Sequence, residues 1–298
     1  MKRIVGHLAV CTAALLLLLL LPFSAMAAPQ GREHYLLIGV DGWGLSEEGG
    51  ARSDAIILAT LDYDEDRVTL VSFARDALVQ PSYRKGLVKL NALVRSTGGD
   101  NALVQYIEEA FSIPVSGYFL VNFSGAVDVI NAIGGVEIEL TRQEANYIRQ
   151  DVGRYKDYPL EEGLCRLNGG QALSYMRCRD LDNDFGRQHR QGNVLRAAFR
   201  SLTQLSMLDA LRMLDDVLGM YRTDMRMFDQ VALVKNALSL RHARLETHSL
   251  PAEGTYQYGV DGTGASALAF DLPANQALLW QWLGMEPPEG WTEEEKQE

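Results

Sequence analysis

The sequence AIILATLDYDEDRVTLVSF, residues 55–73, contains two apolar and partly β-branched runs on either side of an acidic turn. This pattern predicts a β-hairpin with strands at Ala55–Leu61 and Val68–Phe73. A third apolar run, Tyr35–Val40, precedes the hairpin and ends at Asp41 and a glycine-rich turn. Strands that are buried on both faces give such continuous apolar runs. We therefore expect an α/β fold in which a central mixed sheet is flanked by helices on both faces.

Amphipathic patterns predict the helices that cover this sheet. No repeat or linker divides the chain, so we expect one domain at residues 34–284 and a disordered acidic tail at residues 285–298. The predicted helices are Asp100–Phe111, Phe123–Ile133, Gly169–Tyr175, Phe185–Leu205, Leu208–Met220, Met227–Leu240 and Asn275–Leu283, and the further predicted strands are Val136–Leu140, Arg244–Leu250 and Ala267–Phe270.

The N-terminus has the composition of an export signal. Lys2 and Arg3 precede the apolar run Leu8–Phe23, and Ala25-Met26-Ala27 has the small residues of a cleavage site. We expect a signal peptide at residues 1–27. The alternative is an uncleaved signal anchor, because the run is close to the ~17 residues that can span a bilayer. Both readings place the protein outside the cytoplasm, either secreted or anchored to the outer face of the cytoplasmic membrane.

The body of the chain is acidic. The formal net charge is -11, and removing Lys2 and Arg3 with the leader gives -11 - 2 = -13. Nucleic acid would repel such a body, so we expect no nucleic-acid partner. Two cysteines, Cys165 and Cys178, lie in the exported part. Export permits a disulfide between them, and two separate thiols are the open alternative.

Against this acidic background, four arginines lie close together in MRCRDLDNDFGRQHRQ, residues 176–191. Fixed guanidiniums repel one another, and they persist where an anion with several oxygens pairs with them bidentately. The alternative is a solvated helix face whose aspartates absorb the charge. Arg187, Arg190 and Gln191 have the spacing of one helix face near an N-terminus, which itself favours an anion. The other members of the cluster are Arg177 and Arg179, and the aspartates are Asp180, Asp182 and Asp184.

A second group of charged residues is expected at one edge of the sheet. Asp41 follows one strand and Asp54 begins the next, so adjacent strands would bring both carboxylates to that edge. Two such oxygen donors can hold Mg²⁺ together with phosphate oxygens and water. The alternative is that both are turn-forming aspartates. Arg75 and Asp76 directly follow the third strand and reach the same edge, and Arg52 shares a face with Asp54.

The order of these motifs resembles the LytR-CpsA-Psr family of extracytoplasmic bacterial proteins. The resemblance runs from about Tyr35 to Leu205 and continues more weakly to the last predicted helix. Each motif alone is weak, but together they form a specific signature. The segments that carry it are LLIGVDGWG, RSDAIILATL, VTLVSFARDALV, KLN, VNFSGAVDVINAIGGVEIEL, LNGGQALSYMRCR and DFGRQHRQ.

The resemblance implies a phosphotransferase that moves an anionic glycopolymer from a polyprenyl-pyrophosphate lipid onto peptidoglycan at the membrane surface. It also implies a long apolar pocket for the lipid, which the helices Phe123–Ile133 and Val194–Leu205 would line unless they are ordinary core. Mg²⁺ would be held by Asp41 and Asp54. The implied catalytic residues are Arg75, Arg177, Arg179 and Arg187, and the implied pyrophosphate-binding residues are Arg52, Asp76, Asp184, Arg190 and Gln191.

We expect the transferase. The alternatives are a non-catalytic carrier of polyprenyl phosphates, against which the Asp41 and Asp54 pair argues, and a pyrophosphatase that uses water as the acceptor. The general base is also open, since Asp41, Asp76 and Asp184 are equally placed. Two positions depart from the family pattern. Gly42-Trp43-Gly44 follows Asp41 where an arginine is common, and Asp180 stands where a histidine is common.

Overall fold

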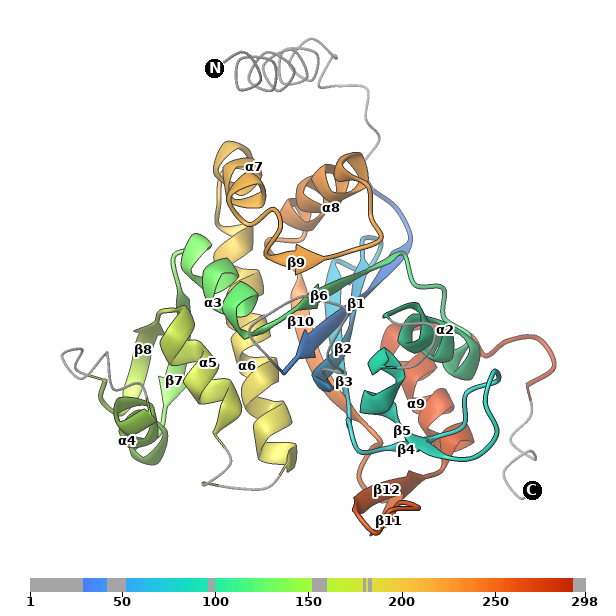
Figure 1. The fold of residues 1–298 in the computed structure, drawn as a ribbon. Coiled ribbons are helices and arrows are strands. Elements are labelled where there is room, and N and C mark those ends of the chain that lie inside the picture. The colour runs from blue at the N-terminus through green and yellow to red at the C-terminus, as the bar shows by residue number, and fades with distance from the viewer. Residues whose placement is uncertain are drawn as a thin grey trace, which may run out of the picture. The chain divides into compact units, whose positions relative to one another are not determined.

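The structure is a computed structural model that describes residues 29–41, 52–95, 100–151, 160–178, 181 and 184–291 (Figure 1). The predicted leader lies outside these residues. By its internal contacts, Gly31–Glu298 forms one unit. Among the helices within the described ranges, none combines the length and the apolar character needed to cross a membrane.

A six-stranded mixed sheet forms the centre, as predicted. Strand β2 lies between β1 and β3 and is antiparallel to both, while β6 runs parallel to β1 and β10 runs parallel to β3. The short strand β9 is antiparallel to β6. In order across the sheet, the strands are β10 (Arg244–Leu250), β3 (Arg67–Phe73), β2 (Ser53–Asp62), β1 (Arg32–Val40), β6 (Gly117–Val121) and β9 (Tyr221–Arg222).

The register of the first three strands determines where the polar residues gather. Arg32 lies opposite Asp62 and Val40 lies opposite Ser53, so β1 ends where β2 begins. The tight turn after β2 brings β3 back alongside it, and β3 ends at Phe73 near the same place. We call the end of the sheet marked by Val40, Ser53 and Phe73 the site edge. Residues that directly follow β1 or β3, or that begin β2, therefore meet there.

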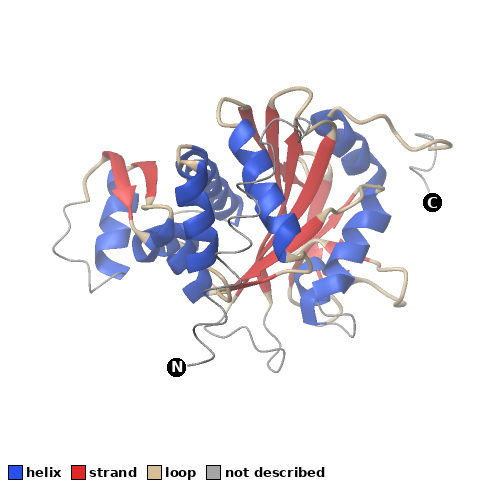
Figure 2. Cartoon of the chain, turned by 90° about the horizontal axis from the view of Figure 1, so that it is seen from above, coloured by secondary structure: helices blue, strands red, loops and turns tan. Residues whose placement is uncertain are grey.

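Helices cover both faces of the sheet (Figure 2). One face is a tightly packed core against η1 (Leu90–Arg95), α2 (Asp100–Phe111) and α9 (Leu272–Leu283). Its side chains alternate along β1, where Leu36 and Ile38 are fully buried. The other face packs against α6 (Asp184–Thr203) and α8 (Met227–Ser239), and α7 (Met207–Asp216) packs against α8.

A smaller lobe lies beside the sheet. It consists of a two-stranded sheet, β7 (Val136–Leu140) and β8 (Gly163–Leu167), with helices α3 (Phe123–Ala132), α4 (Arg142–Asp151) and α5 (Gly169–Arg177). Its own apolar cluster includes Val136 and Ile130. Helix α5 can approach α3 closely because it begins with Gly169. A Cβ at that position would lie 2.1 Å from the carbonyl oxygen of Val127, so no other residue fits without a backbone shift.

Two short hairpins complete the fold near the site edge. One is formed by β4 (Leu78–Val79) and β5 (Val88–Lys89), and the other by β11 (Tyr256–Val260) and β12 (Ser266–Phe270). The second is joined to the chain that leaves β3, because the backbone N–H of Leu268 donates to the carbonyl of Asp76 at 3.0 Å.

All predicted helices and strands are present, with ends shifted by a few residues. The prediction of a disordered tail from residue 285 is wrong for residues 285–291. The Trp291 ring packs edge-on against Trp280, and its indole nitrogen donates to Gln276. The two apolar side chains Met285 and Trp291 give this acidic segment enough surface to pack on the core. Residues 292–298 lie outside the described part of the chain.

Candidate active site at one edge of the sheet

Asp41 and Asp54 lie at the site edge. The backbone N–H of Asp41 donates to the Arg52 carbonyl at 3.1 Å, and the Arg52 N–H donates to Oδ1 of Asp41 at 2.7 Å. This pair extends the β1–β2 ladder by one step beyond Val40. Asp54 is the second residue of β2. The register therefore brings the two carboxylates and Arg52 to one place, as the strand pattern predicts.

Arg75 ties the end of β3 to the start of β2. Its guanidinium forms an ion pair with Asp54, and its Nε lies 3.3 Å from the Asp76 carboxylate. The backbone is held as well, since the N–H of Asn91 donates to the Arg75 carbonyl at 3.0 Å. Both side chains of the Arg75–Asp54 pair remain about one-fifth exposed. A ligand at this edge can therefore reach the guanidinium.

Lys89 adds a cation that sequence reasoning did not single out. Its Nζ lies 3.5 Å from Asp76 and 3.4 Å from Asp261, which stands in the turn between β11 and β12. The Thr263 hydroxyl and backbone N–H, and the Ala265 N–H, donate to Asp261 and hold its pKa well below the usual range. In the sequence this lysine belongs to the KLN triplet, which by itself indicates no role.

Helix α6 carries the second group of cations. Arg187 and Arg190 are each 3% exposed, and Gln191 is also buried. These three residues share one face of the N-terminal half of α6, as their spacing predicts. Burying a guanidinium is costly unless anionic or polar groups surround it, so this face is built around charge.

The N-terminal half of α6 points toward the site edge. In the middle of the helix, Arg196 donates a hydrogen bond to Thr247 of β10, which lies opposite Leu70 of β3. The C-terminal end of α6 leads to Leu205, which belongs to the same apolar cluster as Leu238 of α8, and α8 ends shortly before β10 begins beside the start of β3. The helix therefore runs antiparallel to β3, and its first turns lie toward the end of that strand (Figure 1).

Arg190 and Arg177 have partners within the smaller lobe. Arg190 donates to the Cys178 carbonyl at 2.8 Å and lies 3.8 Å from the Glu144 carboxylate. Arg177 is exposed at the end of α5, and its guanidinium stacks over the Phe123 ring at 4.5 Å. Arg190 therefore supports the chain that follows α5, and Arg177 is held at the surface by a cation–π contact. Cys178, which follows Arg177, is buried.

Part of the predicted site lies outside the described residues. This holds for Arg179, for the side chain of Asp184, for Gly42-Trp43-Gly44 and for Asp180. Among the described residues, no three His, Cys, Asp or Glu side chains are close enough together to form a metal cluster. Cys165 and Cys178, whose pairing the sequence left open, do not form a disulfide.

The α6–α8 face of the sheet is apolar but only partly covered. Small residues, Ala55 and Ala59, lie on the sheet side, and Leu195 and Phe199 of α6 are half-buried against them. For α3, the alternative of ordinary core fits, since Ile130 is buried in the core of the smaller lobe.

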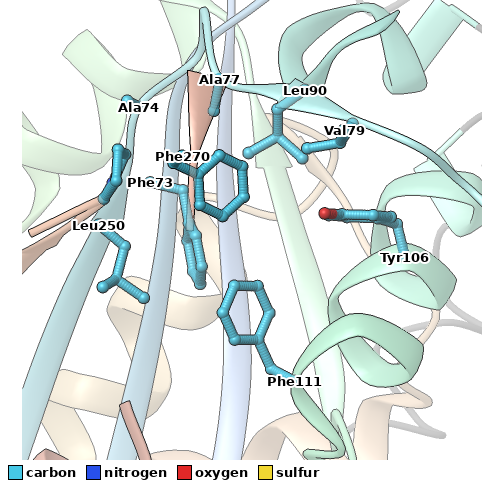
Figure 3. A pocket seen from close by; sticks show the side chains of 10 residues that line it. Phe73, Ala74, Ala77, Val79, Leu90, Tyr106, Phe111, Leu250 and Phe270 are labelled. Carbon is cyan, nitrogen blue, oxygen red and sulfur yellow. The ribbon is translucent and has the colours of Figure 1, made fainter. Parts of the chain in front are cut away.

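The opposite face, against η1, α2 and α9, contains a densely packed core in the described part of the chain. A cavity of about 10 Å³ lies there among Phe73, Phe111, Phe270 and Tyr106 (Figure 3). A volume of this size holds at most one water molecule, so this cavity cannot accept a lipid chain.

The chain matches the model of the LytR_cpsA_psr family over residues 23–275. It is 32% identical to the polyisoprenyl-teichoic acid–peptidoglycan teichoic acid transferase TagU of Enterococcus faecalis, with 76% of this chain and 72% of TagU covered. It is 28% identical to the transferase TagV of Bacillus subtilis over 74% of this chain, and it spans 57% of the length of TagV.

Solved structures of related proteins have the same fold as this chain. The structure of TagT bound to LIIa-WTA matches with a TM-score of 0.69 and 26% identity, covering 88% of this chain and 95% of TagT. The sequence match, the fold and the order of the motifs agree. The chain belongs to the LytR_cpsA_psr family.

Proposed function

We propose that this protein is an extracytoplasmic phosphotransferase that moves an anionic glycopolymer from a polyprenyl-pyrophosphate carrier to peptidoglycan. The observation that carries the proposal is the placement of Arg75 with Asp54 at the site edge, toward which α6 directs the buried Arg187. Cations from two distant segments are thus directed toward one strand edge, which would suit a pyrophosphate. The names of TagU and TagV support the donor and the acceptor, since both describe transfer from a polyisoprenyl-linked polymer to peptidoglycan.

The reaction we propose is an in-line displacement at phosphorus. A hydroxyl oxygen of the acceptor sugar forms a bond to the phosphorus that carries the glycopolymer. The bond from that phosphorus to the bridging oxygen breaks, and polyprenyl monophosphate leaves with the electron pair. The hydroxyl proton passes to a carboxylate at the site edge. Such a transfer depends on positioning and charge neutralisation more than on a covalent partner.

The arginines have distinct parts in this scheme. Arg75 reaches the phosphates from the sheet, held in place by Asp54 and Asp76. Arg187 reaches them from α6, where burial strengthens its electrostatic effect. Arg190 acts indirectly, because its hydrogen bond to the Cys178 carbonyl holds the segment that leads from Arg177 toward Arg179.

Magnesium is part of the proposal. Asp41 and Asp54 offer hard carboxylate oxygens at one partly exposed edge, and two such ligands suit an ion whose shell is completed by phosphate oxygens and water. When bound, Mg²⁺ would neutralise charge on the pyrophosphate.

The polyprenyl chain would lie along the α6–α8 face. This face starts at the site edge and offers half-buried apolar side chains, among them Leu37, Leu195, Phe199 and Leu233. Half-exposed apolar surface gains stability when a hydrocarbon covers it, at about 25 cal/mol per Å².

The test uses the purified protein, a polyprenyl-pyrophosphate-linked glycopolymer, Mg²⁺ and peptidoglycan. We expect polymer attached to peptidoglycan through a phosphodiester, with polyprenyl monophosphate released in equal amount. Cleavage of the donor without attachment would favour a pyrophosphatase. Binding of the donor without cleavage would favour a carrier and would overturn the proposal.

A further inference from the structure

The β11–β12 hairpin has no part in the site described so far, although it is joined to it directly. Lys89 lies between Asp261 in the hairpin turn and Asp76 at the site edge, and Leu268 of β12 donates to the Asp76 carbonyl. The base of the hairpin is anchored by Phe270, which packs beside Phe73 (Figure 3). The hairpin is therefore a rigid extension of the site edge.

Two large apolar side chains of the hairpin are exposed. Tyr258 is 67% exposed and Val260 is 65% exposed, while every residue of β11 after Tyr256 is exposed. The ring of Tyr258 is oriented by an edge-on contact with Tyr256, with 5.6 Å between the ring centroids. Large apolar side chains held outward beside a reaction site are typical of a binding surface.

The chemistry of the hairpin selects the class of ligand. In YQYGVDGTGASALAF, residues 256–270, the only charged side chain is Asp261, which is already held by Lys89. The rest are aromatic, aliphatic, hydroxyl or amide side chains such as Gln257 and Ser266. Such a surface lacks the cations that an anionic glycopolymer or an anionic membrane would require. It suits an uncharged chain of sugar rings, which offers flat C–H faces and hydroxyls.

The position of the hairpin fits the geometry of the reaction. Leu268 and Phe270 pack into the α2–α9 side of the molecule, whereas Leu195 and Phe199 lie on the α6–α8 side. The site edge lies between them. In an in-line displacement the attacking and leaving oxygens lie on opposite sides of the phosphorus. With the polyprenyl chain on the α6–α8 side, the acceptor hydroxyl must approach from the side of the hairpin.

We propose that the β11–β12 hairpin, through Tyr258 and Val260, binds the glycan strand of the peptidoglycan acceptor. This inference rests on the proposed function and adds the acceptor-binding surface to it. The hairpin holds successive sugars so that one hydroxyl faces the phosphorus beside Arg75. The chain of ion pairs from Asp261 through Lys89 and Asp76 to Arg75 keeps this surface in register with the donor site.

The test is co-sedimentation of the full protein with insoluble peptidoglycan sacculi in the absence of any lipid donor. We expect Tyr258→Ala and Val260→Ser each to weaken binding about tenfold, since aromatic and apolar anchors dominate such contacts. Tyr258→Phe keeps the ring and should bind like the wild type. Phe228→Ala is the matched control, because Phe228 is 79% exposed but lies on α8. Thermal melts establish that the variants fold.

A second measurement separates this inference from the proposed function. In the transfer assay, Tyr258→Ala should raise the KM for the acceptor while the affinity for the lipid donor stays unchanged. A wild type that binds sacculi through Tyr258 but transfers nothing would contradict the proposed function alone. Unchanged sedimentation of both hairpin variants, or a wild type that does not sediment with sacculi, would overturn the acceptor surface.

Discussion

The ammonium nitrogen of Lys89 lies 3.5 Å from the Asp76 carboxylate, although neither residue is in a long strand or helix. Asp76 in turn holds the Nε of Arg75, so the lysine sets the position of an arginine that it does not touch. The side chain of Lys89 is 14% exposed and also forms an ion pair with Asp261. A cation in this place keeps two carboxylates from repelling each other beside a site that must bind an anion.

Replacing Lys89 by methionine should lower kcat about tenfold, as is common for residues that orient a site through a partner. Without the lysine, Asp76 would interact with Arg75 alone, and it would compete with the phosphates for the Arg75 guanidinium. Lys89→Arg should restore most of the activity. Lys85→Met, in the exposed β4–β5 loop, serves as the control. Equal kcat values for Lys89→Met and the control would contradict the positioning role.

Replacing Arg187 by alanine should reduce transfer by about 10²–10³-fold, the usual cost of removing one donor that stabilises developing charge. Arg200→Ala is a matched control, because Arg200 is on the same helix but exposed. Steady-state rates at saturating donor and acceptor measure the effect. Since Arg187 is buried, a melt of each variant is needed to separate lost activity from lost folding. A folded Arg187→Ala variant with normal rates would remove this residue from the reaction.

Replacing Asp54 by asparagine should raise the Mg²⁺ concentration needed for half-maximal activity by at least about tenfold, because one of two carboxylate ligands is lost. The same change frees Arg75 from its ion pair, so the maximal rate should fall too. Titration of activity with Mg²⁺ separates the two effects. Asp216→Asn, at the exposed end of α7, should leave the titration curve in place. An unshifted curve for Asp54→Asn would remove it as a ligand.

The parts of the site that follow from local patterns could be predicted. Asp41 and Asp54 reach one edge because apolar runs define the strands, and the turn between the second and third strands sets the order of neighbours. Arg187, Arg190 and Gln191 share a face because helical spacing determines it. In both cases the information lies within a few residues of the side chain concerned.

The parts that depend on contacts between distant segments could not be predicted. Lys89 and Asp261 meet only because β12 packs beside β4, and no pattern in either segment encodes that pairing. Strand β11 is exposed along most of its length, so it lacks the alternation that marks a strand. Arg190 was expected at the phosphates, and two of its partners, the Cys178 carbonyl and Glu144, belong to the smaller lobe. The packing of distant segments determines which partner such a side chain has.

Acid should destabilise the protein through His34, which is 4% exposed at the start of β1. Burial, together with the nearby charge of Arg32, lowers the pKa of His34 to about 4, against a weaker opposing effect of Asp62. The folded protein therefore keeps this ring neutral, with Nδ1 2.9 Å from the Thr60 hydroxyl. The unfolded chain binds a proton at its ordinary pKa near 6.5.

Because the unfolded state binds more protons between pH 6.5 and 4, the free energy of unfolding should fall as the pH drops through this window. The loss should approach ~3 kcal/mol at the lower end. Denaturant unfolding at a series of pH values measures it. His34→Gln has no ring to protonate and should flatten the profile in this window, whereas the exposed His242→Gln should keep the wild-type slope. Parallel profiles for His34→Gln and the wild type would mean that the ring is not held neutral, and that the buried start of β1 tolerates a charge.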